Sequence, residues 1–118
     1  MNDRSPSGGE ARLDAVLGAL ADPTRRSLFE RLRTDGPSTA TDLAEGMPVT
    51  RQAVVKHLQV MTGAGLLASR RDGREVQYRA QPDAMEPAMA WMASAGAAWD
   101  RRFERLRRSV SPADESGA

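Results

Sequence analysis

The sequence predicts a mainly α protein with a small β-hairpin, arranged as a winged helix-turn-helix. Two observations support this fold class. A capped amphipathic helix over residues 50–63 follows a shorter helix and a turn, which is the order of a helix-turn-helix. A tight-turn signal after residue 71 then joins two short alternating segments, which predicts a hairpin beside that helix. At 118 residues, the chain should form one domain, over residues 10–110.

The two ends of the chain have the composition of tails. Residues 1–9 and residues 111–118 are rich in Ser, Gly and Pro, so we expect both to be disordered. The absence of cysteine excludes disulfides, thiolate metal ligands and a cysteine nucleophile. Because the chain has no apolar run of about 20 residues and no signal-peptide pattern, we expect no membrane partner and a cytoplasmic location.

Positive charge is concentrated in the middle of the chain. The formal net charge is +1 overall, but it is −2 over residues 1–50, +4 over residues 51–79 and −1 over residues 80–118. Sixteen basic residues are arginine and one is lysine, a bias that genome composition alone can produce, so the evidence is their placement. A positive middle segment fits a surface that meets a polyanion.

Two helices should precede the helix-turn-helix pair. The first has four apolar residues at i, i+3, i+4 and i+7, which are Leu13, Val16, Leu17 and Leu20. The second starts at Asp22 as N-cap with Pro23 behind it, and should run to about Thr34. Its apolar face consists of Leu28, Phe29 and Leu32. Its arginines should point largely outward, solvated or paired with Glu30 or Asp22, and contact with DNA phosphates is the alternative. They are Arg25, Arg26, Arg31 and Arg33.

The helix-turn-helix itself is predicted from its caps. Thr39 to Asp42 can form a capping box for a short helix that stops at Gly46. Thr50 is the expected N-cap of the next helix, and two glycines, Gly63 and Gly65, should end it. The apolar face of this helix holds Ala53, Val54, Leu58 and Met61.

The opposite face of that helix carries Gln52, Val55, Lys56 and Gln59, which line a single stripe. Amides and an ammonium group can reach base edges and phosphates in a DNA groove, so we interpret residues 50–63 as a recognition helix. The alternative is an ordinary amphipathic helix with a solvated outer face.

Residues 66–71 and 75–80 are predicted strands, joined by Asp72-Gly73. Arg70, Arg71 and Arg74 lie near the tip of this hairpin. Beside a recognition helix, a basic tip suits a wing that contacts the DNA backbone or minor groove. The alternative is a charged edge that prevents strand-to-strand aggregation.

The last helix should run from near Pro82 to about Val110, with Pro87 in its first turns. Apolar residues recur along it every three or four positions. In a monomer this stripe would favour aggregation, so we interpret it, together with the first helix, as a homodimer interface. The candidate interface residues are Leu13, Val16, Leu17, Leu20, Met89, Met92, Trp99, Phe103 and Leu106. A ligand pocket lined by Met and Trp is the alternative, and the two are compatible.

Several of these segments together resemble the ArsR family of winged helix-turn-helix transcriptional regulators. They are Leu-Ala-Asp-Pro-Thr-Arg-Arg at 20–26, Leu-Ala at 43–44, Val-Thr-Arg-Gln-Ala-Val-Val-Lys-His-Leu at 49–58, Ala-Gly-Leu at 64–66 and the wing at 71–78. The resemblance covers about residues 12–108. It implies a homodimer built from the first and last helices, which binds an inverted-repeat operator and usually represses transcription. An unidentified small-molecule effector is left open.

The ligands of the family's metal sensors are missing here. Such members carry Cys-x-Cys before an Asp-Leu in the third helix, whereas Thr39, Ala40 and Thr41 precede Asp42 here, and hydroxyls are poor ligands for soft metals. The other common site uses His and carboxylates on the last helix, which has no His in this chain. The single histidine, His57, is assigned a structural role. We therefore expect no metal and no other cofactor.

The expected function is that of a DNA-binding transcriptional regulator, a homodimeric repressor at an inverted-repeat operator. An enzyme is not expected, because the chain has no Ser/His/acid set and no phosphate loop. Base contacts are expected from Arg51, Gln52 and Val55, the last through a thymine methyl. Phosphate contacts are expected from Thr50, Lys56, Gln59, Arg70, Arg71 and Arg74. A second hypothesis is a protein-interaction module that uses the same scaffold without selective DNA binding.

Overall fold

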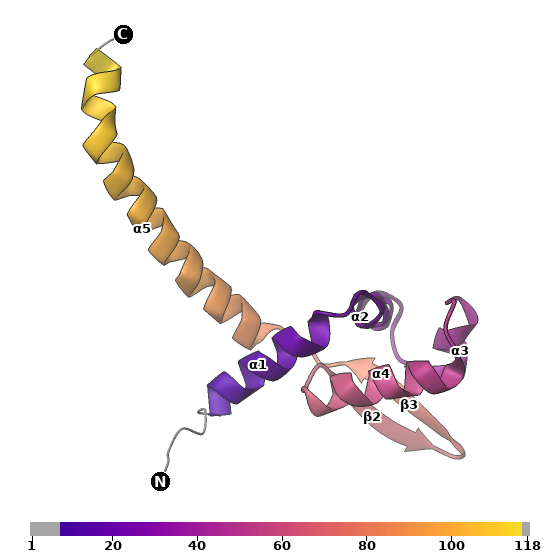
Figure 1. Ribbon diagram of the computed structural model, residues 1–118. Helices are drawn as coiled ribbons and strands as arrows, with labels where there is room; N and C mark the ends of the chain where they lie inside the picture. The colour runs from indigo at the N-terminus through magenta and orange to yellow at the C-terminus, as the bar shows by residue number, and fades with distance from the viewer. Residues whose placement is uncertain (1–7, 117–118) are drawn as a thin grey trace. The chain divides into compact units, whose positions relative to one another are not determined.

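The computed structural model describes residues 8–116, and its elements follow the predicted order with one strand added (Figure 1). They are α1 (Gly8–Leu20), α2 (Pro23–Asp35), β1 (Ser38–Thr39), α3 (Ala40–Glu45), α4 (Arg51–Gly63), β2 (Leu67–Asp72), β3 (Glu75–Ala80) and α5 (Glu86–Ser116). The chain divides into two compact units between Ala88 and Met89. The first unit holds α1 to β3 and the first turn of α5, and the second holds the rest of α5.

The terminal helices are longer than composition predicts. α1 begins at Gly8 and α5 continues to Ser116, so residues 8–9 and 111–116, expected in disordered tails, are helical. Once a helix has formed, each added residue gains a hydrogen bond without a new nucleation cost. At its other end α5 begins at Glu86, four residues later than predicted, with Pro87 in the first turn. The expected disorder of residues 1–7 and 117–118 falls outside the described residues.

The first unit is built around one apolar core to which its helices and the hairpin all contribute. α4 supplies Val54, Leu58 and Met61, each 0% exposed. Burial of side chains of this kind stabilises the fold by about 1.5–3 kcal/mol each. Ala53, predicted on the same face, is only half-buried. The predicted apolar face therefore sets the rotation of α4 about its axis.

The apolar face of α1 packs against this same core. Val16 and Ala19 are each 2% exposed, and Leu13 and Leu20 lie half-buried against the core. The sequence predicts Val16 at a dimer interface, but the side chain is buried within its own protomer and cannot contribute there. The i, i+3, i+4 spacing identifies an apolar face without revealing what covers it. Of the four candidate residues on α1, Leu17 is the exposed one, at 39%.

The ends of α2 and α4 have the predicted caps. The Asp22 carboxylate accepts hydrogen bonds from the backbone N–H groups of Thr24 (2.8 Å) and Arg25 (3.1 Å), which makes it the N-cap of α2. α4 ends in a Schellman motif, in which Leu66 N–H donates to the Met61 carbonyl. Gly65 takes the left-handed position in this motif, with φ of 86°.

Arg25 joins three helices instead of pointing into solvent. Its Nε donates to the Ala19 carbonyl (2.6 Å) and its Nη2 to the Gly18 carbonyl (3.3 Å). Its Nη1 lies 3.4 Å from Nδ1 of His57 on α4. The last carbonyls of a helix have no partner within that helix, so a guanidinium that binds them also stabilises the helix end.

Two other arginines of α2 have similar partners. Arg26 Nη1 donates to the Leu20 carbonyl (2.6 Å), and Arg31 Nη1 donates to the Leu43 carbonyl (2.8 Å). Arg33 alone of the four pairs with an acid, on the preceding turn of α2. Arg26 is exposed, as expected, whereas Arg25 and Arg31 are half-buried instead of pointing into solvent. All three also bind backbone carbonyls of neighbouring helices, which was not expected.

The sheet has three antiparallel strands in the order β1-β3-β2. β1 was not predicted, because two residues are too few to show an alternating pattern. Asp72 pairs with Glu75, so the hairpin turn consists of Gly73 and Arg74, one residue later than predicted. Gly73 has φ of 67°, and no residue other than glycine has positive φ in the described chain, which is the pattern of a type II′ turn.

We predict that Arg25→Ala lowers the free energy of unfolding by about 1–2 kcal/mol, since it removes charge-assisted hydrogen bonds to two carbonyls and the contact with His57. Urea denaturation followed by circular dichroism measures this loss. Arg33→Ala is the matched control, because its exposed ion pair should contribute less than about 0.5 kcal/mol. Equal losses in the two variants would show that Arg25 does not join the helices.

We predict that the stability lost in Asp22→Ala depends on pH. The backbone N–H of Arg25, foremost, holds the pKa of the Asp22 carboxyl below its ordinary value, and the charges of His57 and Arg25 act in the same direction. A lowered folded-state pKa means that the stabilisation is complete at neutral pH and is lost as the pH falls through that pKa. The difference in melting temperature between wild type and variant should therefore shrink below about pH 4. A constant difference between pH 7 and pH 3 would contradict this.

Candidate nucleic-acid interface

α4 presents a row of three polar side chains on the side opposite its buried face. Gln52, Lys56 and Gln59 are exposed, and they follow one another at i, i+4 and i+7. None of the three makes a hydrogen bond or ion pair with another residue in the described part of the chain. Their donors and acceptors are therefore free to bind another molecule. We call these three residues the α4 row.

Val55 departs from the prediction that it projects beside this row. Its side chain is half-buried and packs against the core. The cause is its position on the border between the buried and exposed faces of α4, where a branched apolar side chain gains from contact with its neighbours. A part of Val55 stays accessible, so contact with a thymine methyl remains sterically open.

The first two residues of the recognition segment are already engaged within the protein. Thr50 Oγ1 accepts a hydrogen bond from the backbone N–H of Ala53 (3.1 Å), as predicted for the N-cap. Arg51 Nε donates to Thr41 Oγ1 (3.0 Å) and so links α4 to α3. The Thr50 hydroxyl can still donate its own proton, and Arg51 is exposed and keeps its other N–H groups. Both can meet a phosphate, but Arg51 must do so from this tethered position.

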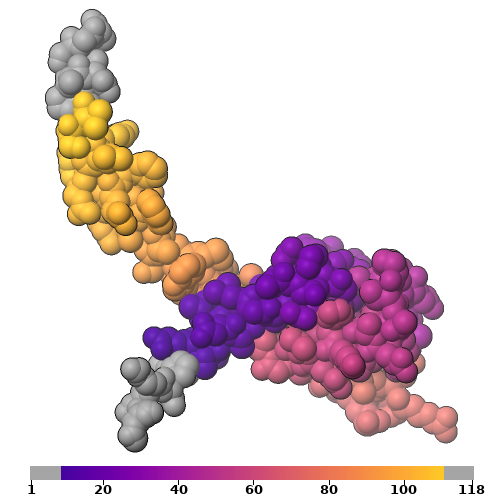
Figure 2. Space-filling view, in the orientation of Figure 1, coloured from indigo at the N-terminus to yellow at the C-terminus, as the bar shows by residue number. Residues whose placement is uncertain are grey.

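The tip of the hairpin projects beyond the helices of the first unit (Figures 1 and 2). Arg71 is paired with Val76 and Arg70 with Gln77, so the two arginines lie on opposite faces of the sheet. Val76 belongs to the face that packs against the helices, and Arg71 extends that face outward. Arg70 shares the other face with Arg79, which the candidate site had left out. Strand alternation alone would have shown this division.

His57 lies half-buried on α4, beside the α4 row. Its Nδ1 lies 3.4 Å from the Arg25 guanidinium, which also binds the carboxyl end of α1. An uncharged Nδ1 can accept this hydrogen bond. The predicted structural role of His57 thus has a specific partner, which spacing along the sequence could not reveal because Arg25 is 32 residues away.

The charge of this surface is positive. α4 contains no acidic residue, and Lys56 and Arg51 are exposed on it. The acids of the hairpin, Asp72 and Glu75, are confined to the tip. No Asp or Glu side chain in the described residues forms an ion pair with Lys56 or Arg51.

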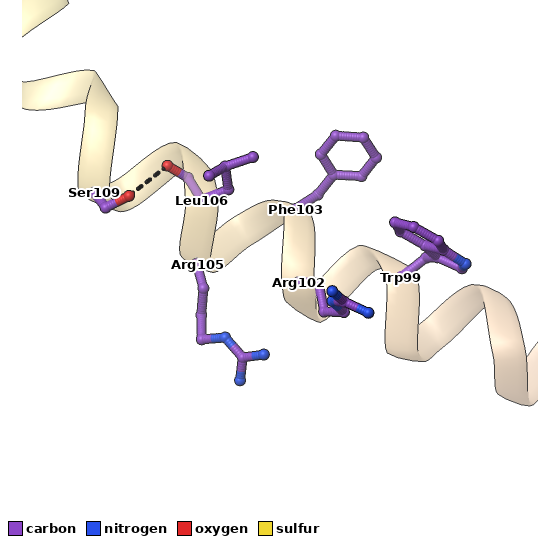
Figure 3. A pocket seen from close by; sticks show the side chains of 6 residues that line it. All are labelled: Trp99, Arg102, Phe103, Arg105, Leu106 and Ser109. Carbon is purple, nitrogen blue, oxygen red and sulfur yellow. Dashed lines mark hydrogen bonds between the residues drawn. The ribbon is translucent and has the colours of Figure 1, made fainter.

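The second unit carries the apolar stripe of α5. Trp99, Phe103 and Leu106 extend from the same side of the helix and are each 59% exposed, whereas Arg105 extends from the opposite side (Figure 3). The rings of Trp99 and Phe103 lie 6.4 Å apart, and the Arg102 guanidinium lies 5.2 Å from the Trp99 ring. The hollow of about 390 Å³ between these side chains is lined by residues of this one helix, so α5 alone cannot enclose a ligand.

Met89 and Met92, the other predicted interface residues of α5, are also exposed, at 61% and 50%. Within residues 8–116, no three His, Asp or Glu side chains gather closely enough to hold a metal ion. None of the described helices combines the length and the apolar character needed to cross a bilayer.

Comparison with known proteins agrees with this geometry. A helix-turn-helix domain family matches residues 20–70. The transcriptional repressor SdpR of Bacillus subtilis is 28% identical over 80 residues, which are 68% of this chain and 88% of that protein. The HTH-type transcriptional regulators Rv2034 and NmtR of Mycobacterium tuberculosis are 42% and 38% identical, and the chain spans 64% and 59% of their length.

Solved structures match over more of the chain. An ArsR-like transcriptional regulator from Rhodococcus is 35% identical, with a TM-score of 0.75, over 88% of this chain and 97% of that one. The homodimeric winged helix-turn-helix DNA-binding domain of a possible ArsR-family regulator from Mycobacterium bovis has a TM-score of 0.61, over 80% of this chain and 91% of that one. At 21% identity, the latter shows likeness of fold alone. The chain belongs to the ArsR family of helix-turn-helix transcriptional regulators, which are not enzymes.

Proposed function

We propose that this protein is a homodimeric repressor that binds an inverted-repeat DNA operator without a metal cofactor, in the cytoplasm. The observation that carries the proposal is the α4 row, three polar side chains without partners in the described chain on the face of α4 that the core leaves exposed. Each protomer would place α4 in a major groove, with half-sites about one helical turn apart. Repression is supported by the likeness to a transcriptional repressor.

The proposed dimer rests on the apolar stripe of α5. Met89, Met92, Trp99, Phe103 and Leu106 are all at least half exposed, which would be an aggregation liability for a lone chain. A second copy would cover the stripe and give two α4 helices related by a twofold axis, as an inverted repeat requires. The homodimeric mycobacterial domain of the same fold supports this assembly. On α1, Leu17 is the candidate interface residue that is exposed.

The proposed division of labour follows from the placement of each side chain. Gln52 carries an amide that can form two hydrogen bonds with adenine, and Arg51 and the exposed part of Val55 are the other candidates for base contact. Lys56, Gln59, Thr50 and the wing arginines would bind phosphates and set the register. Among the wing arginines, Arg71 and Arg74 are best placed, because Arg71 extends the helix-facing side of the sheet and Arg74 lies at the turn.

We predict a steep salt dependence for operator binding. If a dimer neutralises about eight phosphates, log K should fall against log salt with a slope near −7. Fluorescence anisotropy with a labelled operator fragment at several KCl concentrations measures the slope. An affinity that does not change with salt would remove the electrostatic part of the proposed interface.

We predict that Gln52→Ala and Arg74→Ala have different effects. Gln52→Ala should lose about 1–3 kcal/mol of discrimination between operator and random DNA, because it removes a base contact. Arg74→Ala should weaken binding to both DNAs by the same factor, because phosphates are common to every sequence. Competition binding with the two DNAs measures both quantities. If both variants changed the specificity ratio alike, the proposed assignment of base and phosphate contacts would be wrong.

A further inference from the structure

Two adjoining hollows lie at the carboxyl end of β3, and of the residues proposed to bind DNA only Arg70 lines one of them. The larger, of about 400 Å³, is formed by α2, the Gly36-Pro37 turn, the end of β3 and the segment that leads to α5. The smaller, of about 130 Å³, lies on the sheet. Both are lined by Pro37 and Arg79, so they form one groove, and no residue of α4 lines either. All lining residues belong to the first unit.

The larger hollow has an apolar floor. Phe29 and Leu32 are core residues of α2 that line it, and the half-buried Met85 lines it as well. Small-molecule sites have volumes of roughly 300–1,000 Å³ and combine an apolar lining with a few polar groups. The polar groups here are Arg79 and Gln81, together with the exposed Arg33 at the rim, and no Asp or Glu is among the lining residues.

Arg79 and Arg70 give the groove a cationic end. Ala68 pairs with Arg79 and Arg70 pairs with Gln77, so both guanidinium groups and the Gln77 amide lie on one face of the sheet. Neither arginine makes a hydrogen bond or ion pair with any residue in the range 8–116. The positive charges of Arg70 and Arg79 repel each other, because the two residues occupy neighbouring cross-strand pairs on the same face of the sheet. A bound anion would relieve that repulsion.

We propose that this groove binds a small organic anion with an apolar body. The carboxylate or sulfonate of the ligand would form a bidentate ion pair with the guanidinium of Arg79. Gln77 and Arg70 would lie beside this ion pair. The apolar body would lie over Phe29, Leu32 and Met85. Binding at this site goes beyond the proposed DNA binding and does not depend on it. Because Arg79 lies on β3, the ligand would touch a strand whose other end forms the wing.

The test is a titration of the uniformly ¹⁵N-labelled full-length protein with 4-phenylbutyrate, followed by two-dimensional amide NMR in the absence of DNA. We expect saturable shifts of the Gly36, Ala80 and Gln81 amides, which line the groove. The matched neutral probe, 4-phenylbutan-1-ol, has the same apolar body without the anion. We expect it to bind at least about tenfold more weakly, because it cannot form the ion pair with Arg79.

Two variants separate anion recognition from a general loss of positive charge. Arg79→Gln should weaken 4-phenylbutyrate about tenfold and leave the alcohol unaffected. Arg74→Ala removes the same charge from the same hairpin outside the groove, and should leave the affinity for 4-phenylbutyrate unchanged. The proposal is overturned if acid and alcohol bind equally, if Arg79→Gln and Arg74→Ala weaken the acid alike, or if shifts occur only in residues 89–110, on the α5 stripe. The absence of any saturable shift would overturn it as well.

Discussion

The burial of Val54, Leu58 and Met61 is the constraint on which the rest of the structure depends. These three side chains lose all contact with solvent, so any rotation of α4 about its axis would expose apolar surface at a cost of several kcal/mol. Fixing the rotation fixes the opposite face as well. Gln52, Lys56 and Gln59 are presented to solvent because the other side of the helix is held by the core.

Besides the core, hydrogen bonds at the junction of α1, α2 and α4 also hold α4 in place. Arg25 binds the carboxyl end of α1 through two carbonyls and contacts His57 on α4, while Asp22 caps the helix that carries Arg25. Residues from three helices therefore depend on one guanidinium. The Asp-Pro-Thr-Arg segment, which first appeared as a helix start and a family signature, is also the tie between α1 and the helix proposed to read DNA.

Sequence patterns correctly predicted the features that depend on interactions between residues close together in the chain. The Asp22 cap, the left-handed Gly65 just after α4 and the alternation along β3 each depend on residues within a few positions of one another, and all were confirmed. The same alternation separates Arg70 from Arg71, which lie on opposite faces of the sheet and do not form one basic patch.

The sequence could not predict which surfaces pack together when their residues lie far apart along the chain. Val16 lies on an apolar face that the core covers, and Arg25 finds His57 across 32 residues of sequence. β1 forms only because β3 offers it an edge, since two residues carry no periodic signal of their own. The groove at Arg79 is likewise assembled from α2 and β3. Each of these features depends on tertiary packing, which spacing does not encode.

The central claim is that two copies of α4, each rotated by the core to expose its polar row, read a twofold-symmetric DNA sequence. Sequencing the DNA that the purified full-length protein selects from a random pool tests it most directly. Enrichment of an inverted repeat with half-sites about one helical turn apart is the predicted result. A pool that shows no enrichment after repeated rounds, or one that yields only a single unpaired half-site, would contradict the claim.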